Sequence, residues 1–407
     1  MSSLTTAITI CDRPHIGGGA SKIAIETASA LAKMGLNSYF FSALGDPDPA
    51  LVESGVICVN CGQGDVLNGG VSGAVQGIWN RRSETALDDL LNQLDPENGG
   101  RSCAFFGRTP LSPSYIQGNR ATGASNVSLL PMSTSLFARN GGLYDYVNHC
   151  NCGIAPGSPK CLLHNCDKRS YAQKLYRSVR FSVQNHVLGS LRPAVAFVSD
   201  SSRRLIEPHL AWNSERYDCL NYVDAAKFQD DSEGDSSAYL FVGRLSPEKG
   251  CDLFCEAACR AGVNAIVIGD GTELKRLSDS YPDIRFMGSL PHDEVLSVMK
   301  QSRAIVMPSV CRETFGLVAY EAMIAAGLPC IVSDVGDAAS FVMSKGLGEI
   351  FNAGSVESLS DAMVNMLDSD VYSRYREAVE KADFSHLKKI AYVERLIGIY
   401  DQLMVEL

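Results

Sequence analysis

The sequence predicts an α/β protein made of two doubly wound domains, each a parallel sheet with helices on both faces. The chain has 407 residues, whereas a single hydrophobic core stops growing at roughly 250 to 300 residues. Apolar strands alternate with amphipathic helices in both halves, which is typical of parallel sheets. With 45% hydrophobic and 20% charged residues, the composition is that of an ordinary globular protein.

The first half begins with a strand, a glycine turn and a helix. These segments are TAITICD, HIGGGA and SKIAIETASALAKMG, and the strand SYFFSAL follows them. A strand, a helix and a second strand in this order predict a βαβ unit and hence a parallel sheet. From Thr109 to Asp167 the alternation gives way to Pro, Gly, Ser and Asn. A segment this long without regular structure usually serves function, so we expect part of the active site there.

The alternation restarts after residues 229–238, QDDSEGDSSA, an acidic and Ser-rich stretch that suits an interdomain linker. Strands and helices then follow one another through AYLFVGR, GCDLFCEAACRAG, AIVIGD, TELKRLSDSY, IRFMG, HDEVLSVMKQS, AIVMPS, GLVAYEAMIAAG and PCIVSD. Unbroken apolar strands of this kind are buried on both faces. We expect an N-terminal domain over residues 1–225, a C-terminal domain over 226–385, and a helix in 386–407 that packs back on the N-terminal domain.

The charge balance argues against nucleic acid as a partner. The formal net charge is −10, so a phosphate backbone would be repelled. The N-terminus lacks the pattern of a secretory signal, and no run of ~18 apolar residues suits a membrane span. We expect a cytoplasmic protein whose contact with the inner face of the membrane, where it occurs, is peripheral. The basic and aromatic stretch KRSYAQKLYRSVRF suits anionic lipid, although a solvated helix face is the favoured interpretation.

Two cations follow the first strand of the second half. Arg244 and Lys249 lie in GRLSPEKG, between that strand and the next helix. Ligands of open α/β sheets bind at the carboxyl ends of the strands, where helix N-termini point. An Arg fork and a Lys ammonium at such a turn suit a diphosphate. The alternative is a solvated surface turn.

Two glutamates, Glu313 and Glu321, lie in SVCRETFGLVAYEAM with seven residues between them. We expect Glu313 just before a helix and Glu321 two turns further along it. Carboxylates bind sugar hydroxyls well, because each accepts two hydrogen bonds from a vicinal diol. Backbone N–H groups that open the helix would hold phosphate or sugar oxygens, and they belong to Thr314, Phe315, Gly316 and Leu317. The alternative for Glu313 is an acid that only complements the helix dipole.

In this order, GRLSPEKG, GDGTELKRL, FMGSLPHDEV and PSVCRETFGLVAYEAMIAAGLPCIVSD resemble the donor-binding domain of glycosyltransferase family 4. The resemblance is densest from Tyr239 to Asp334. It implies the GT-B fold, in which an acceptor-side and a nucleotide-sugar-binding Rossmann-like domain face each other across a cleft. It also implies retaining transfer of a hexose from a nucleotide diphosphate sugar, UDP- or GDP-linked, to a glycan or lipid-linked acceptor in polysaccharide biosynthesis.

The resemblance implies a role for each matched position. Arg244 and Lys249 would bind the donor diphosphate, and Glu313 would hold the donor sugar near the reacting carbon; these three are the predicted catalytic residues. Glu321 would bind the ribose hydroxyls. Further donor contacts are predicted for Thr314, Phe315, Gly316, Leu317, Leu290 and Gly269, and for Gly18 and Gly19 of the first glycine turn. No cofactor and no catalytic metal are required, because the cations and a helix N-terminus stabilise the leaving diphosphate.

The chain departs from the family at the histidine that usually faces the donor sugar from the first domain. Three positions compete for that place: Tyr144, Thr134 and His149. The departure motivates an alternative function, a GT-B subunit that binds nucleotide or glycan without catalysis within a biosynthetic assembly. A third hypothesis is a related enzyme that uses phosphate or epimerises a nucleotide sugar.

The chain holds fourteen cysteines, scattered as expected for reduced thiols in a large domain. One stretch, HCNCGIAPGSPKCLLHNC, gathers Cys150, Cys152, Cys161 and Cys166. Four thiolates can bind Zn²⁺ tetrahedrally, so a structural zinc site is a hypothesis beside free thiols and disulfides.

Overall fold

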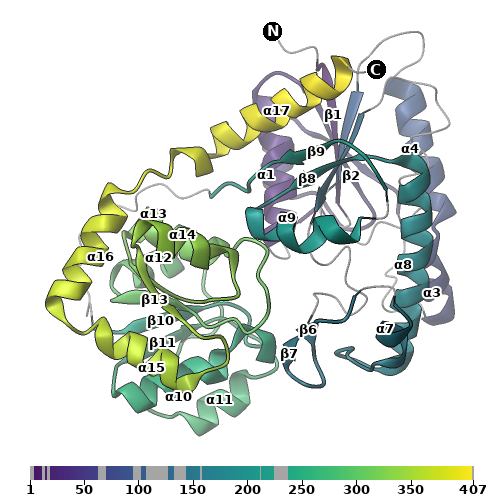
Figure 1. Ribbon diagram of the computed structural model, residues 1–407. Helices are drawn as coiled ribbons and strands as arrows, with labels where there is room; N and C mark the ends of the chain where they lie inside the picture. Colours follow the sequence, from purple (N-terminus) through teal and green to yellow (C-terminus); the bar gives the residue numbers. More distant parts are fainter. Residues whose placement is uncertain are drawn as a thin grey trace. The chain divides into compact units, whose positions relative to one another are not determined.

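The computed structural model describes residues 4–11, 14–15, 19–62, 70–94, 102–106, 127–132, 144–155, 158–210, 212–223 and 237–405 (Figure 1). The chain divides into two compact units. The first unit comprises Met1–Gly141, Ile154–Asn221 and Lys389–Leu407, and the second comprises Gly142–Gly153 and Tyr222–Lys388. The expected domain boundaries, at 225/226 and 385/386, lie a few residues from these divisions, but the short segment Gly142–Gly153 falls in the second unit rather than the first.

The first unit is built on a seven-stranded parallel sheet with the order β3-β2-β1-β4-β5-β8-β9. Its strands are β1 (Thr6–Cys11), β2 (Asn37–Ser42), β3 (Ile57–Asn60), β4 (Ser102–Phe106), β5 (Val127–Met132), β8 (Ala194–Phe197) and β9 (Arg216–Asp218). Its helices are α1 (Gly19–Lys33), α2 (Pro49–Glu53), α3 (Gly70–Ile78), α4 (Arg81–Leu94), α7 (Pro159–Leu163), α8 (Tyr171–Leu191), α9 (Asp200–Ile206) and α17 (Lys389–Val405).

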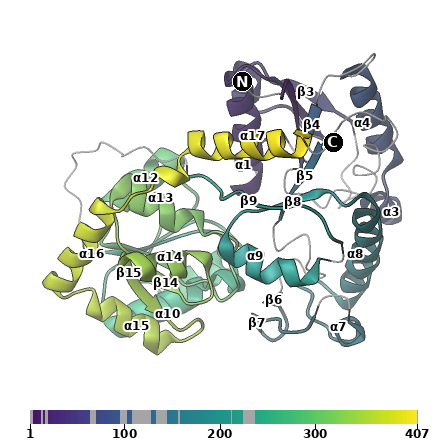
Figure 2. The ribbon, with the colours of Figure 1, turned by 45° about the horizontal axis from the view of Figure 1, so that its top comes forward.

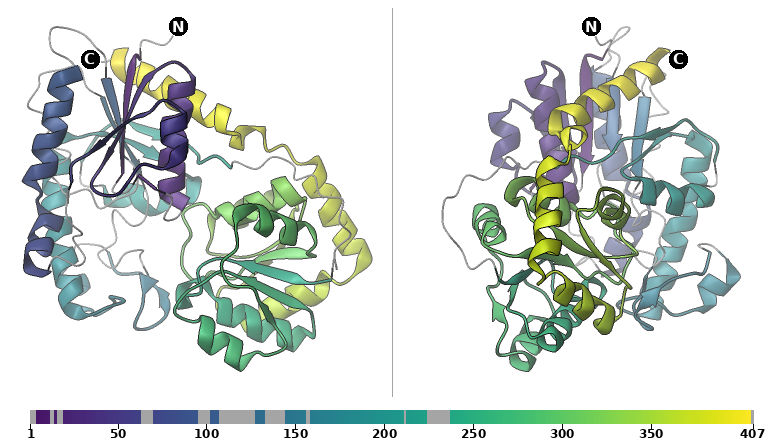
Figure 3. Two further views of the ribbon diagram at one scale, coloured as in Figure 1. Left: turned by 180° about the vertical axis from the view of Figure 1, so that it is seen from behind. Right: turned by 60° about the vertical axis from the view of Figure 1, so that its left-hand side comes forward.

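Neighbouring residues of one strand divide the core of this unit between the two faces of the sheet. Phe40 packs with α1 and α2, whereas Phe41 packs with α4, α8 and α9. Because successive side chains of a strand point to opposite faces, a strand covered by helices on both sides is buried along its whole length. All six residues of β1 are buried accordingly. The views in Figure 3 show helices on both sides of the sheet.

The last helix, α17, packs against α1 within the first unit (Figure 2). Thr27 Oγ1 donates to Tyr392 Oη at 3.4 Å, and Lys389 Nζ lies 3.1 Å from Glu26 Oε2. Tyr392 is fully buried at this contact. The helix is thus held to α1 by both apolar packing and an ion pair.

The second unit has a six-stranded parallel sheet with the order β12-β11-β10-β13-β14-β15. Its strands are β10 (Tyr239–Val242), β11 (Ala265–Ile268), β12 (Arg285–Phe286), β13 (Ala304–Met307), β14 (Cys330–Ser333) and β15 (Gly348–Phe351). Its helices are α10 (Cys251–Ala261), α11 (Leu274–Ser280), α12 (His292–Lys300), α13 (Leu317–Ala326), α14 (Asp337–Lys345), α15 (Val356–Asn365) and α16 (Ser369–Lys381), with the 3₁₀ turns η3 (Pro247–Lys249) and η4 (Ser385–Leu387).

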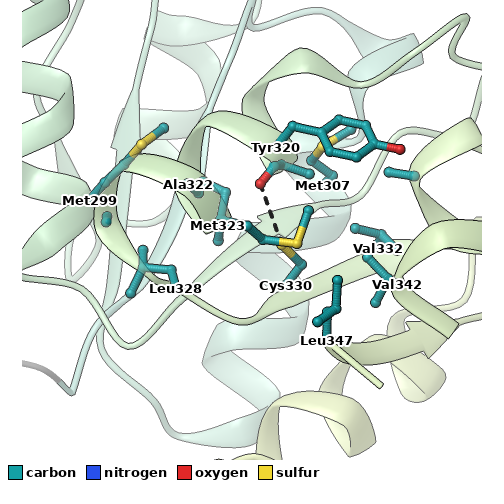
Figure 4. Packing of buried hydrophobic residues seen from close by; sticks show 14 of the residues in the cluster. Met299, Met307, Tyr320, Ala322, Met323, Leu328, Cys330, Val332, Val342 and Leu347 are labelled. Atoms are coloured by element: carbon teal, nitrogen blue, oxygen red, sulfur yellow. Dashed lines mark hydrogen bonds between the residues drawn. The ribbon is translucent and has the colours of Figure 1, made fainter. Parts of the chain in front are cut away.

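Strand order reverses between β10 and β13 in this sheet, because β11 and β12 lie on one side and β14 and β15 on the other. Such a switch point opens a crevice at the carboxyl ends of the two central strands. On one face of the sheet, α12, α13 and α14 enclose a buried cluster that includes Met299, Met323 and Leu347 (Figure 4). Cys330 Sγ lies within this cluster and donates to Ala319 O at 3.7 Å.

A two-stranded antiparallel hairpin completes the second unit. It is formed by β6 (Tyr144–Asp145) and β7 (Cys150–Asn151), with Tyr144 opposite Asn151. Among the helices in the described ranges, none has both the length and the apolar composition needed to cross a bilayer.

Candidate functional site

The turn after β10 carries the first two site residues, Arg244 and Lys249. Arg244 is exposed, and its Nη2 atom lies 2.9 Å from Oε1 of the buried Glu248. Gly250 ends the turn at φ 69°, and a Cβ atom there would lie 2.1 Å from Pro308 O. Only glycine fits this position, because its backbone both adopts the left-handed region and touches the segment that follows β13. The turn is therefore packed directly against the end of the neighbouring strand.

Lys249 meets Glu313 across the switch point. Their Nζ and Oε1 atoms are 2.6 Å apart, and both side chains are largely shielded from solvent. Burial alone would lower the pKa of Lys249, but the charge and hydrogen bond of Glu313, together with the nearby Cys311, outweigh it, and the pKa of Lys249 is raised. Ser309 Oγ also donates to Glu313 Oε1. The Glu313 carboxylate is thus held by a cation from the β10 turn and a hydroxyl from the β13 loop.

Backbone hydrogen bonds join the same two loops. The N–H groups of Val310 and Cys311 donate to Glu248 O at 3.1 and 3.3 Å. Burial raises the pKa of the Cys311 thiol to about 11, although the neighbouring Lys249 lowers it. Cys311 is therefore a neutral thiol at physiological pH.

Helix α13 begins at Leu317, after the N-cap Gly316 at φ 81°. Glu313 therefore lies in the loop before the helix, and its position is set by Ser309 and Lys249 rather than by helical spacing from Glu321. Phe315 is buried and stacks on Tyr320 with ring centroids 4.8 Å apart, which anchors the helix start. Glu321 lies within α13 and is half-buried. Thr314, in the loop before the helix, is half-buried too.

Gly269 and Leu290 belong to the loops after β11 and β12. A Cβ atom on Gly269 would lie 1.9 Å from Gly243 O, so the two backbones touch at this point. The Gly269 N–H donates to Gly288 O at 2.8 Å. Leu290 is half-buried and packs against the core of the unit. The structure thus brings the predicted positions of the second half to the loops that follow β10, β11, β12 and β13.

Predicted positions of the first half are described only in part. Gly18 and Thr134 lie outside the described residues, and Gly19 is the first residue of α1. His149 is exposed and adopts φ 51° in the hairpin. Tyr144 is 1% exposed, and burial, followed by the nearby Cys311 and Glu248, raises its pKa. Among these candidates, Tyr144 is therefore a buried anchor of the second unit.

The four clustered cysteines do not form a metal site in the described structure. Cys150 and Cys152 lie in the second unit, whereas Cys161 and Cys166 are buried in the first. Within the described residues, no three His, Cys, Asp or Glu side chains are grouped so as to hold a metal ion. None of the four cysteines forms a disulfide, and Cys166 Sγ lies 3.0 Å from the buried Lys174 Nζ. The zinc hypothesis therefore has no support from the described geometry.

Three residues of the site were not identified from the sequence: Glu248, Ser309 and Asn151. Glu248 and Ser309 carry a signal that sequence analysis can use, because both are polar residues just beyond the carboxyl end of an apolar strand. Asn151 carries no such signal, since it contacts the loop after β13 from a distant part of the chain.

Comparisons with known proteins place the second half of the chain beside glycosyltransferases. Residues 223–383 match the model of the family glycosyl transferases group 1. Phosphatidyl-myo-inositol mannosyltransferase of Mycobacterium leprae is 34% identical over 161 residues, which cover 36% of this chain and 42% of that protein. A GDP-mannose-dependent alpha-mannosyltransferase of Mycobacterium tuberculosis is 32% identical over 140 residues, which cover 34% of this chain and 35% of that protein. The chain spans about half the length of the curated relatives it matches.

Solved structures are similar over nearly the whole chain. Sucrose-phosphate synthase from Thermosynechococcus elongatus superposes with a TM-score of 0.69 at 16% identity, covering 99% of this chain and 100% of that one. WaaG, a glycosyltransferase involved in lipopolysaccharide biosynthesis, gives a TM-score of 0.64 at 15% identity, covering 97% and 99%. The expected GT-B fold is thereby confirmed, and residues 223–383 are similar to the glycosyl transferases group 1 family.

Proposed function

We propose that the protein is a retaining glycosyltransferase of family 4 that moves a hexose from a nucleotide diphosphate sugar to a glycan or lipid-linked acceptor. The observation that carries this proposal is the contact between Lys249 and Glu313, 2.6 Å apart at the switch point between β10 and β13. A diphosphate needs cations, and a sugar needs hydrogen-bond acceptors; this pair offers both side by side.

Each side chain has a distinct role in the proposed reaction. The bond between the anomeric carbon and the diphosphate oxygen breaks, the acceptor hydroxyl oxygen bonds to that carbon on the same face of the sugar, and the hydroxyl proton passes to the leaving diphosphate. Lys249 and Arg244 stabilise the negative charge that develops on the diphosphate, together with the N-terminus of α13. Glu313 accepts hydrogen bonds from the sugar hydroxyls, and Glu321 accepts those of the ribose.

The names of the relatives suggest which donor to test first. Several relatives are named GDP-mannose-dependent alpha-mannosyltransferases, and a structural neighbour, HepE of Anabaena, was solved with UDP and glucose. We therefore infer a GDP- or UDP-linked hexose. Release of the nucleotide diphosphate from GDP-mannose and UDP-glucose, with and without glycan acceptors, tests the proposal. No release from any nucleotide sugar would contradict it.

A non-catalytic donor-binding subunit is the second candidate function. The observation that favours it is that Tyr144, a candidate for the place of the family's cleft histidine, is buried and so does not offer its side chain to a ligand. Saturable binding of a nucleotide diphosphate without turnover of any nucleotide sugar would support this candidate over the enzyme.

Turnover is expected to be independent of divalent metal. Arg244 and Lys249 place two cations at the turn where the diphosphate is proposed to bind, so the leaving group is neutralised by the protein itself. The rate in excess EDTA should remain within about twofold of the rate with Mg²⁺. A rate that collapses in EDTA and returns on adding Mg²⁺ would show that the metal supplies this charge instead.

We also propose that the protein meets anionic membranes peripherally through helix α8. Tyr171, Leu175 and Val179 are 38%, 43% and 53% exposed at successive turns of one face. Lys168 and Arg169 directly precede this face. Exposed apolar side chains beside basic ones are typical of helices that lie on anionic lipid.

Vesicle binding tests this contact. We expect co-sedimentation with phosphatidylserine vesicles that weakens in high salt and is lost in Leu175→Glu. The matched control is Val364→Glu, which charges a similarly exposed apolar residue (49%) on α15 of the other unit. Equal binding by wild type and Leu175→Glu would refute the contact.

A further inference from the structure

The β6–β7 hairpin contacts the loop after β13 through one side chain, Asn151. Asn151 Nδ2 donates to Val310 O at 2.9 Å, and the N–H of Arg312 donates to Asn151 Oδ1 at 3.2 Å. A neighbouring β-strand would satisfy a C=O group and the N–H group two residues later in this same way. The Asn151 amide thus substitutes for a strand partner along residues 310–312.

The opposite side of that loop is held as well. Val310 and Cys311 donate their N–H groups to Glu248 O in the turn after β10. The backbone just before Glu313 is therefore fixed between the Lys249 turn on one side and the hairpin on the other. Holding a reacting group through fixed supporting contacts is how active sites limit misplacement.

The hairpin is itself ordered by internal contacts. Asp145 Oδ1 accepts the N–H groups of Val147 and Asn148 at 2.9 and 3.0 Å, which shapes the turn. Tyr144, opposite Asn151 in the ladder, is 1% exposed and meets Tyr146 edge to face, with ring centroids 5.1 Å apart. The Asn151 amide is therefore presented by a preformed structure rather than by a free chain.

We propose that Asn151 is a positioning residue that holds the 310–312 backbone so that Glu313 stays against Lys249, which makes the hairpin a structural part of the donor site. This rests on the proposed function, in which Glu313 holds the donor sugar. The turn with Arg244 and Lys249 has its own support from Gly250 and Pro308. Loss of Asn151 should therefore impair use of the sugar while sparing attachment of the diphosphate.

Asn151→Ala tests the proposal through kinetics. We expect kcat for the nucleotide sugar to fall about 10- to 100-fold, because a displacement on the order of 1 Å has effects of this size. The affinity for GDP or UDP alone should change less than about twofold, since the proposed contacts of Arg244 and Lys249 with the diphosphate remain. The matched control is Asn264→Ala, which removes an exposed amide hydrogen bonded only to Ser237 in the same unit, and it should behave as wild type.

Asn151→Asp distinguishes two causes of a lower kcat, the loss of the positioning hydrogen bonds and a failure of the variant to fold. A protonated carboxyl group offers the same donor and acceptor as the amide, whereas a carboxylate cannot donate to Val310 O. The pKa of this carboxyl group is expected above its ordinary value, since its charged form faces a carbonyl oxygen. The ratio of variant to wild-type kcat should therefore rise as the pH falls from about 8 to about 5, toward the range where Asp titrates.

Hydrogen exchange gives a readout that does not depend on turnover. The Arg312 amide should exchange faster in Asn151→Ala than in wild type and be unchanged in Asn264→Ala. Wild-type exchange at Arg312 together with a wild-type kcat would overturn the proposal, as would a kcat ratio for Asn151→Asp that stays low at every pH. If the wild-type chain turned over no nucleotide sugar, the proposed function would fail, and faster Arg312 exchange would still establish the contact that Asn151 makes.

Discussion

Replacing Lys249 or Glu313 with alanine is expected to lower kcat by on the order of 10²- to 10³-fold, the usual effect of removing a group that stabilises transition-state charge. The two side chains are 2.6 Å apart, so each replacement also leaves its partner half-buried without its counter-charge. Lys249→Ala should weaken binding of the nucleotide diphosphate itself. Glu313→Ala should spare that binding and lose turnover of the nucleotide sugar, because its proposed contact is with the sugar. Initial rates and titration with GDP or UDP measure the two effects.

Two further variants make this test specific. Glu313→Gln keeps an acceptor for Ser309 but removes the charge that faces Lys249, so its kcat should lie between those of wild type and Glu313→Ala. Lys381→Ala is the matched control, because it breaks an exposed Lys–Glu pair on α16 of the same unit. Exposed ion pairs contribute about 0–1 kcal/mol, so this control should be active and stable. Wild-type turnover in both alanine variants would rule out the proposed site.

Gly250→Ala is expected to destabilise the second unit far more than Gly262→Ala. The two glycines flank α10 with nearly equal backbone angles, φ 69° and φ 65°. Alanine in this left-handed region costs roughly 1–2 kcal/mol at either position. At Gly250 the new Cβ atom would also lie 2.1 Å from Pro308 O, whereas nothing lies within 4 Å at Gly262. Overpacking against backbone adds about 3 kcal/mol at Gly250 only. Gly262→Ala therefore measures the cost of the left-handed backbone alone, and Gly250→Ala measures that cost plus the clash with Pro308.

Calorimetry measures this difference as a difference in melting temperature between the two variants. The unfolding transition of the second unit is identified as the one that moves to higher temperature when nucleotide diphosphate is added. Gly262→Ala should retain transfer activity. Gly250→Ala should lose activity along with stability, since the Lys249 turn rests on the backbone of Pro308. Equal melting temperatures for the two variants would show that the contact of Gly250 with Pro308 does not limit the stability of the second unit.

Much of the fold could be predicted because the relevant patterns are local. The strands β10, β11, β13 and β14 appear in the sequence as unbroken apolar runs. Helix α13 appears as a largely apolar run closed by Gly327. The helices α14, α15 and α16 were not identified. The segment from Thr109 to Asp167 was expected to be irregular, but it includes β5, the hairpin and α7. Short strands without a long apolar run leave little local signal.

The residues of the candidate site were likewise predictable from the sequence only in part. Arg244, Lys249 and Gly269 could be placed at strand ends from the sequence alone, because ligands of doubly wound sheets meet those ends. The ion pair of Lys249 with Glu313 and the amide contacts of Asn151 could not be predicted. Their partners are far apart in the chain, and only the order of strands decides which loops become neighbours.

By itself, the sequence determined the fold class, the resemblance of the second domain to a glycosyltransferase family and the residue types available at each strand end, because periodicity and short motifs reflect neighbours along the chain. Tertiary structure alone decided that β13 lies beside β10, that Glu313 therefore meets Lys249, and that the hairpin holds the loop before Glu313. The physical reason is that the pairing of parallel strands depends on how helices pack over both faces of the complete sheet. That packing is a property of the whole domain rather than of any one segment.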